Sequence, residues 1–339
     1  MPHTTSTAAF ISHDAHRHRV CVAPMLDWTD RHCRYFHRLL TRRALLHTEM
    51  VTTGALLHGD VARHLRLDAA EQPVALQLGG CCPADLAQCA KLAQQWGYRE
   101  VNLNCGCPSP RVQRGAFGAC LMTQPALVAD GIRAMQDAVS IPITVKHRIG
   151  LDKEESYDFV RDFVGTLSTA GCRTFIVHAR NAWLSGLSPK DNRTMPPLRY
   201  EWVYRLKRDF LGLEIVLNGG VISSDQIATH LCHVDGVMVG REAYHRPWWL
   251  SEWDDRFWPE CAEVDHNAGC TPVAQVEQQM VVYMLEQARL DGTHWLSIAR
   301  HLLGLRHGLA GARRWRRVWS DHSLKHLAPE HVMALANKD

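Results

Sequence analysis

A short segment with two cysteines holds the side chains of this chain best suited to chemistry. Cys105 and Cys107 follow an apolar run that ends at Asn104, and Gly106 stands between them. Glycine allows a tight turn at that point, and Pro108 fixes the backbone directly after Cys107. Thiols at the end of a strand, next to polar amides, are placed for chemistry rather than packing. The alternative is that both are buried packing residues, as most free cysteines are.

Lys146 and His178 are further candidates, each at the end of an apolar run. The lysine has three interpretations: a Schiff-base nucleophile, a charge partner for an anionic cofactor, or a buried ion pair with Glu49. The histidine fits a base, a hydrogen-bond donor to a ring carbonyl, or a core residue with satisfied hydrogen bonds. Arg180, two residues further on, favours a ligand for an anion or a heterocycle.

Two glycine-containing segments have the composition of a phosphate site. Asn218, Gly219 and Gly220 precede a Ser-x-x-Gln sequence typical of a helix N-terminus, and Gly240 is followed by Arg241. Glycine lets the backbone approach a ligand closely, and exposed amides beside an arginine attract a dianion. Ordinary turn glycines would explain either segment alone, but the two together favour phosphate binding.

Eight short apolar segments, separated by helix-like stretches, would position these groups. The expected strands are Val20–Ala23, Leu45–Thr48, Val74–Leu78, Val101–Leu103, Ile143–Lys146, Thr174–Val177, Glu214–Leu217 and Gly236–Val239. Several are continuously apolar, as parallel strands covered on both faces are. This alternation of strands and helices predicts an α/β fold, a (β/α)₈ TIM barrel with its active site at the carboxyl ends of the strands. A doubly wound open sheet is the alternative, but no Gly-x-Gly-x-x-Gly turn follows the first strand.

Composition divides the chain into three regions. We expect a flexible N-terminal tail at 1–19, a catalytic barrel at 20–250 and a small C-terminal helical domain at 251–339. Helices are expected to begin at Pro83, Pro125 and Ser223. In the last region, apolar residues at three- and four-residue spacing predict two helices. One contains Val276, Met280, Met284 and Ala288, and the other Trp295, Ile298, Leu302, Leu305 and Leu309.

Bulk properties exclude several classes of protein. With 339 residues and 46% apolar content, the chain can fill a sizeable core, so wholesale disorder is excluded. The twelve cysteines are scattered and no secretory signal is evident, which favours a reduced, cytoplasmic protein. No apolar run reaches the ~20 residues of a membrane span, and no cysteine grouping has zinc-site spacing. We expect neither membrane attachment nor a metal, and we expect a monomer.

A stretch without acidic residues lies between Asp291 and Asp321. A solvated helix face is the usual explanation of a charge run. In a C-terminal region otherwise rich in acids, the segregation instead favours a surface for a phosphate backbone, with Lys190 and Arg193 as a second contact. The run contains Arg300, Arg306, Arg313, Arg314, Arg316 and Arg317, with Trp315 and Trp319 interleaved.

The ordered motifs at the expected strand ends resemble those of the flavin-dependent tRNA-dihydrouridine synthases. The similar segments are 24–30 (PMLDWTD), 76–80 (LQLGG), 102–109 (NLNCGCPS), 145–150 (VKHRIG), 177–180 (VHAR), 217–221 (LNGGV) and 240–244 (GREAY). Segments 178–184 (HARNAWL) and 186–193 (GLSPKDNR), with the arginine-rich C-terminal end, are similar to the A subfamily. That subfamily acts on U20 and U20a of the tRNA D-loop.

The resemblance implies roles by position. Cys107 would be the proton donor, Cys105 would be a packing residue, and Asn104 would contact the flipped uridine. Arg180, Lys190, Arg193 and Arg300 would join Asn104 in binding tRNA. FMN would be held by Pro24, Met25, Leu26, Gln77, Lys146, His178, Asn218, Gly219, Gly220, Gly240 and Arg241.

The implied reaction adds a hydride from reduced FMN to C6 of uracil and a proton to C5. A free thiol has a pKa near ~8.5, is mostly protonated at neutral pH and can give up that proton. NADPH would reduce the flavin again in a transient visit, since no dinucleotide motif is present. The alternatives are an FMN-dependent reductase of free pyrimidines, a Schiff-base TIM-barrel lyase that uses Lys146, and a non-catalytic RNA-binding module.

Overall fold

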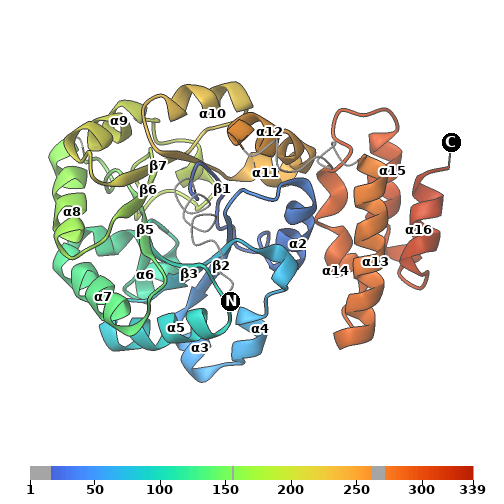
Figure 1. Ribbon diagram of the computed structural model, residues 1–339, viewed down its shortest axis with the longest axis horizontal. Helices are drawn as coiled ribbons and strands as arrows, with labels where there is room; N and C mark the ends of the chain where they lie inside the picture. Colours follow the sequence, from blue (N-terminus) through green and yellow to red (C-terminus); the bar gives the residue numbers. More distant parts are fainter. Residues whose placement is uncertain (1–16, 155, 261–271, 339) are drawn as a thin grey trace, which may run out of the picture. The chain divides into compact units, whose positions relative to one another are not determined.

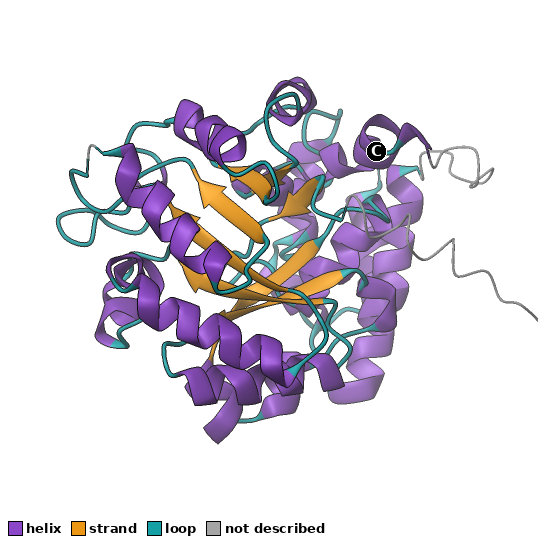
Figure 2. Cartoon of the chain, turned by 60° about the vertical axis from the view of Figure 1, so that its left-hand side comes forward, coloured by secondary structure: helices purple, strands orange, loops and turns teal. Residues whose placement is uncertain are grey.

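Eight parallel strands form the centre of the protein in this computed structural model, which describes residues 17–154, 156–260 and 272–338. Each strand from β2 to β7 pairs with the next in chain order, and β8 pairs with β1. Figure 2 shows the strands in orange with purple helices around them. A bridge between Cys21 and Leu45 joins β1 to the start of β2, so the ring closes. The predicted TIM barrel is confirmed. The strands are β1 (Val20–Val22), β2 (Leu46–Thr52), β3 (Val74–Gly79), β4 (Glu100–Cys105), β5 (Ile143–Arg148), β6 (Thr174–His178), β7 (Glu214–Asn218) and β8 (Gly236–Val239).

Most of the barrel belongs to the first of two compact units, which contains Ala44–Leu67, Gln72–Val239 and the described residues up to Met25. Its helices alternate with the strands and lie outside them (Figure 1). They are α3 (Thr53–His58), α4 (Val61–Leu65), α5 (Pro83–Gln95), α6 (Pro110–Arg114), α7 (Pro125–Ala138), α8 (Tyr157–Thr169), α9 (Tyr200–Asp209) and α10 (Ser224–Leu231), with short 3₁₀ turns at Gly118–Thr123 and Asp191–Arg193.

The predicted helix starts are confirmed, and each has a local cause. Pro83 and Pro125 occupy the first turns of α5 and α7, where a missing backbone N–H costs nothing. Ser223 caps α10, since its hydroxyl accepts from the Gln226 backbone N–H at 3.3 Å. One free donor of the first turn is thereby satisfied, and the Gln226 side chain in turn accepts from the N–H of Ile222, the residue before the cap, at 2.8 Å.

The barrel interior is partly apolar and partly polar. Cys21, Ala23, Leu45, Ala75, Ile176, Val216 and Met238 form an apolar cluster. Glu100 and Asn102, however, are fully buried although both carry polar side chains. Alternate residues of a strand face the same side, so Glu100, Asn102 and Asn104 all point to the interior of the barrel. β4 therefore carries a row of polar side chains into the barrel interior.

Only β8 has the expected bounds; the other strands differ at one or both ends, and β2 and β4 differ most. β2 continues to Thr52, and its register with β3 is irregular between His47 and Met50. Here the Thr48 hydroxyl, rather than a backbone carbonyl, accepts from the Gln77 N–H at 3.0 Å. Glu49 consequently lies within the strand and not at its end. β4 includes Cys105, which the sequence placed after the strand.

The second unit contains Leu26–Arg43, Asp68–Glu71 and the described residues from Gly240 onward. The sequence placed the start of the C-terminal domain at residue 251 instead, and those functional boundaries stay a prediction. The α-helices of this unit are α2 (Arg31–Leu40), α11 (Arg241–His245), α12 (Trp253–Phe257), α13 (Val273–Asp291), α14 (Trp295–Ala299), α15 (Ala312–Trp319) and α16 (Pro329–Ala336). Short 3₁₀ turns occur at Ala69–Glu71, Pro247–Glu252, Leu302–Gly304 and His322–Leu324.

One of the two helices expected in the C-terminal region is present, and the other is an α-helix only over its first part, α14. α13 buries Val276, Met280 and Met284, although Ala288 is exposed. The second pattern is wrong as a continuous helix, because the chain after α14 turns at Gly308 and Gly311, both with positive φ. Leu309 lies between them and is 46% exposed.

Of the expected N-terminal tail, residues 1–16 lie outside the described part of the chain. His18 is buried and bonded to Glu100, so it belongs to the barrel rather than to a tail. None of the helices in the described residues has the length and apolar character needed to cross a bilayer.

Candidate active site

The loop after β4 holds Cys107 in a fixed backbone conformation. The Asn104 side-chain oxygen accepts from the N–H groups of Gly106 and Cys107, at 3.1 and 3.0 Å. On the other side, the Cys107 carbonyl accepts from the Ala119 N–H at 2.9 Å. Gly118 has a φ of +77°, and a Cβ there would lie 2.6 Å from the Cys107 carbonyl oxygen. The close approach therefore requires glycine, and the loop is held from both sides.

The two cysteines of this segment have different surroundings. Cys105 is fully buried at the end of β4, and burial raises the pKa of its thiol. Such a thiol is inert. Cys107 is partly exposed, and its sulfur donates to the Ser109 hydroxyl at 3.6 Å. Cys107 is therefore the accessible thiol of the pair.

Lys146, two residues before the end of β5, donates to the Asn218 side-chain oxygen at 2.9 Å. An amide oxygen does not neutralise the ammonium charge. Burial lowers the pKa of Lys146 to about 7, and the nearby Arg148 charge acts in the same direction. An ammonium held this way favours an anionic ligand, and its lowered pKa also fits a Schiff-base lysine.

The turn after β7 lies against His178. Gly219 and Gly220 have φ values of +118° and +73°. A Cβ on Gly219 would lie 2.8 Å from the His178 ring, so only glycine fits. The Tyr200 hydroxyl donates to the Gly219 carbonyl at 2.8 Å and holds the turn in place. Backbone N–H groups of such a turn form a cradle for an anion.

Arg148 is a functional residue for which the sequence assigned no role. Its guanidinium is buried and donates to the carbonyls of Gly106 at 3.2 Å and Asn192 at 3.0 Å. It therefore joins the Cys107 loop to the loop after β6. Burial lowers the pKa of Arg148 to about 10, and the charges of Arg193 and Arg180 act in the same direction. The available signal was its two-residue spacing from Lys146 along a strand, which puts both on one face.

The other residues expected to hold the cofactor fall in both units. Gln77 accepts from the Asn104 side-chain nitrogen at 2.9 Å. Pro24 and Met25 follow β1, and Met25 packs against the apolar cluster of the barrel. In the second unit, Leu26 is 68% exposed, and Gly240 with Arg241 forms the start of α11.

The residues expected to bind tRNA differ in exposure and in the hydrogen bonds that their side chains make. Lys190 and Arg193 are exposed on the loop after β6. Arg180 donates to the Pro196 carbonyl. Arg300 donates to the Asp27 carbonyl and to the Asp30 carboxylate, both at 2.6 Å, so its guanidinium already holds a loop of its own unit. The sequence missed Arg111 and Arg114, which are exposed on α6 directly after the Cys107 loop.

The tryptophans of the arginine-rich stretch are core residues. Trp315 and Trp319 are each 1% exposed, and their indole N–H groups donate to one Glu277 carboxylate oxygen at 2.6 and 2.9 Å. Arg306 binds the other oxygen of Glu277 at 2.6 Å. These three side chains therefore stabilise the second unit and are not a surface for stacking bases. Arg313, Arg316 and Arg317 are exposed.

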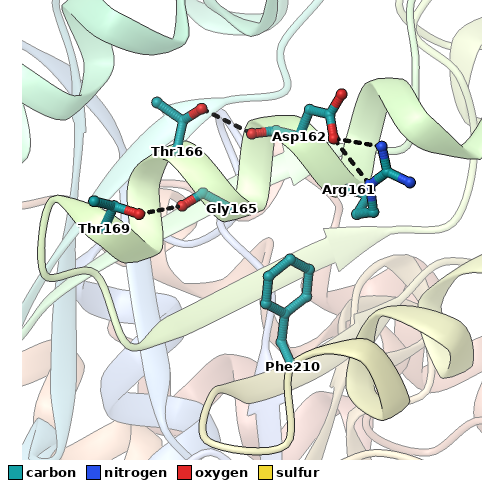
Figure 3. Close-up of a pocket in the computed structure, with 6 residues that line it drawn as sticks. All are labelled: Arg161, Asp162, Gly165, Thr166, Thr169 and Phe210. Atoms are coloured by element: carbon teal, nitrogen blue, oxygen red, sulfur yellow. Dashed lines mark hydrogen bonds and ion pairs between the residues drawn. The ribbon is translucent and has the colours of Figure 1, made fainter.

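A surface hollow of about 410 Å³ lies beside α8, and its groups satisfy one another. Arg161 pairs with Asp162 at 2.8 Å, and the Thr166 and Thr169 hydroxyls donate to carbonyls of the same helix (Figure 3). This leaves the strand ends as the better candidate site. They combine buried cations, a glycine cradle and an accessible thiol, which suit an anionic ligand with a phosphate and a proton-transfer reaction.

Comparisons with known proteins give one consistent result. A family model described as dihydrouridine synthase matches residues 21–337. A protein of Pseudomonas putida strain KT2440 called tRNA-dihydrouridine(20/20a) synthase is 56% identical over 302 residues, which cover 89% of this chain and 88% of the relative. Proteins of the same name from Yersinia pestis and Escherichia coli K12 are 55% and 54% identical, over 91% and 94% of this chain and 87% and 91% of the relatives.

The fold is also similar to a solved structure of a different enzyme. Morphinone reductase superposes with a TM-score of 0.51 at 13% identity, over 69% of this chain and 85% of that chain. At this identity the similarity concerns the barrel fold alone.

Proposed function

The chain belongs to the dihydrouridine synthase family of flavin-dependent oxidoreductases, and we propose that it reduces uridines 20 and 20a of the tRNA D-loop to dihydrouridine. The observation that carries the proposal is the site itself. An accessible thiol, Cys107, is held by backbone contacts next to the buried cations Lys146 and Arg148. Such a site can hold an anionic cofactor and deliver a proton beside it.

The residues at the strand ends fit FMN. The Lys146 ammonium, whose partner is a neutral amide, would balance the negative charge of the cofactor. Gly219 and Gly220 would offer backbone N–H groups to its phosphate, and Arg241 stays a predicted phosphate contact. When bound and reduced, FMN supplies the hydride for C6 of uracil. The remaining contacts would come from Pro24, Met25, Leu26, Gln77, His178, Asn218 and Gly240.

Cys107 would hold the proton at its sulfur and deliver it to C5 of uracil. The bonds from Gly106 and Cys107 to Asn104 fix the backbone that carries the thiol. The Asn104 amide nitrogen has two hydrogens, and one is used in the bond to Gln77. The second can be donated to a carbonyl of the uracil ring. Asn104 would therefore position the base and the acid together.

The substrate would be a uridine that has left its stack, which costs a few kcal/mol in a duplex and less in a loop. Exposed cations near the Cys107 loop would bind the neighbouring phosphates: Lys190 and Arg193, with Arg111 and Arg114 added by the structure. Arg180 and Arg300 stay predicted tRNA contacts, but each already bonds to a carbonyl of its own unit. A tRNA substrate also favours a cytoplasmic protein, and NADPH is the proposed reductant.

Variants of the two neighbouring cysteines test the proposal. Cys107→Ala should retain FMN and tRNA affinity and lose dihydrouridine formation by about 10²–10⁴-fold, the usual contribution of a general acid. Cys105→Ala is the matched control, because this thiol is buried, and it should remain active. The substrate is tRNA from cells that lack this protein, with dihydrouridine mapped along the chain.

Four outcomes would contradict parts of the proposal. Unchanged activity of Cys107→Ala would remove its role as the acid. Dihydrouridine at positions other than 20 and 20a would refute the site assignment. Equal turnover of free uridine and tRNA would favour the reductase of free pyrimidines. A borohydride-trapped adduct on Lys146 without bound flavin would favour the lyase.

A further inference from the structure

A chain of buried side-chain hydrogen bonds runs up the barrel interior to the Cys107 loop. The Asn104 amide nitrogen donates to Gln77 at 2.9 Å, and the Gln77 nitrogen donates to Asn102 at 2.8 Å. The Asn102 nitrogen then donates to the Thr144 hydroxyl at 2.9 Å, and that hydroxyl donates to Glu100 at 2.6 Å. Gln77 lies opposite Asn102, and Asn102 lies opposite Thr144, in the registers of β3 with β4 and of β4 with β5.

The chain ends in an ion pair at the amino-terminal end of the strands. The second Glu100 oxygen binds one ring nitrogen of His18 at 2.7 Å, and Glu214 binds the other at 2.9 Å. With carboxylates on both nitrogens, the ring is an imidazolium. Burial alone would lower the pKa of His18, but the two carboxylates outweigh it and raise the pKa to about 10. Burial would raise the pKa of Glu100, and the His18 charge outweighs it and lowers the pKa to about 2.

The charge of Glu100 determines the direction of every bond in the chain. An ionised carboxylate only accepts hydrogen bonds, so the Thr144 hydroxyl must donate to it. The hydroxyl oxygen is then the acceptor for the Asn102 nitrogen. The Asn102 oxygen in turn accepts from Gln77, and the Gln77 oxygen accepts from Asn104. At the top, the Asn104 oxygen faces the N–H groups of Gly106 and Cys107. A reversed Asn104 amide would put its own N–H groups against these two donors.

We propose that Glu100 is a positioning residue that acts through Thr144, Asn102 and Gln77 on the amide orientation of Asn104 and so on the loop carrying Cys107. A chain of hydrogen bonds can fix one arrangement of the site, which an apolar core at the same place would not do. A buried ion pair is weak support for stability, and apolar residues of the same size often replace one at no loss. A row of amides with one permitted direction, however, selects a single arrangement of the site.

This inference rests on the proposed role of Cys107, but its test does not depend on activity. Thr144→Val keeps the shape of the side chain and removes the hydroxyl that links Glu100 to Asn102. The measurement is amide hydrogen exchange of Gly106 and Cys107 in the full-length protein, by mass spectrometry with single-residue resolution. We expect both amides to exchange about fivefold to tenfold faster, because their acceptor is no longer held in one orientation. Thr144→Ser keeps the hydroxyl and should retain wild-type exchange.

Thr174→Val is the matched control. The Thr174 hydroxyl donates to Glu214 at 2.8 Å, so this change removes a partly buried hydroxyl–carboxylate bond of the same polar cluster that is not part of the hydrogen-bond chain. It should leave exchange at Gly106 and Cys107 unchanged. If Thr144→Val does not fold, Thr144→Cys takes its place, because a thiol is a weak donor and acceptor.

The inference is overturned if the valine variants at 144 and 174 have equal effects on the two amides, or if neither has one. Faster exchange in Thr144→Val with unchanged dihydrouridine formation would overturn the link from the chain to the reaction. The expected result is faster exchange and a lower kcat with little change in KM for tRNA, in Thr144→Val alone. If the wild-type protein forms no dihydrouridine but the variants show this exchange pattern, the proposed function is contradicted and the role of the hydrogen-bond chain in holding the loop is supported.

Discussion

The stability of the second unit should depend on one buried carboxylate, Glu277. This side chain is 1% exposed and accepts from the indoles of Trp315 and Trp319 and from the guanidinium of Arg306. Glu277→Ala would leave two buried indole N–H groups without an acceptor, at about 1–3 kcal/mol each, and would separate Arg306 from its charge partner. We expect a loss of about 3–5 kcal/mol in the free energy of unfolding, as for other buried pairs that lose one partner.

Glu277→Gln separates the contribution of the carboxylate charge from that of the size and shape of the side chain. The amide oxygen can still accept from both indoles, while its nitrogen faces Arg306 in place of a carboxylate oxygen. The hydrogen bond from Arg306 is lost, because an amide nitrogen cannot accept, but the indoles keep their acceptor, so we expect a cost of about 1.5–3 kcal/mol, below that of the alanine variant.

The assay is urea unfolding followed by tryptophan fluorescence and circular dichroism, with free energies taken from the midpoint and slope. Glu286→Ala, an exposed change on the same helix, should stay within about 0.5 kcal/mol of the wild type. A loss below about 1 kcal/mol for Glu277→Ala would refute the reasoning, because the indoles would then not depend on this acceptor. A larger loss for the glutamine than for the alanine variant would also refute it.

Three further predictions concern the cofactor, pH and RNA. Lys146→Met should weaken FMN binding about tenfold or more (~1.4 kcal/mol), measured by flavin fluorescence; unchanged affinity would contradict the charge pairing. The folded-state pKa of His18 is raised to about 10 by Glu100 and Glu214, so stability should be full below about pH 6.5 and fall as pH rises towards 10. Urea midpoints across this range should decline less in His18→Gln. Arg317→Ala should reduce the slope of log affinity for tRNA against log salt by about 0.7–0.9, and an unchanged slope would exclude a phosphate contact there.

Local sequence patterns determined the elements of the barrel and the order of the site motifs. Prolines at Pro83 and Pro125 and a capping serine at Ser223 mark helix starts that the structure confirms. These signals act within one turn of the chain, so they can be recognised without knowing the fold. The family could be identified for a related reason, since its motifs are short segments that each end a strand.

The tertiary structure decided which polar side chains meet inside the barrel and which tryptophans are buried. The bonds from Thr144 to Glu100 and from Trp319 to Glu277 each join residues more than 40 positions apart. They depend on strand register and helix packing, which a local pattern does not encode. The arginine-rich stretch with interleaved tryptophans has the sequence pattern of an RNA surface, but both indoles are buried and donate to Glu277. In the same way, the row of amides below Cys107 exists only because the parallel pairing of β3 with β4 and of β4 with β5 places these side chains opposite one another.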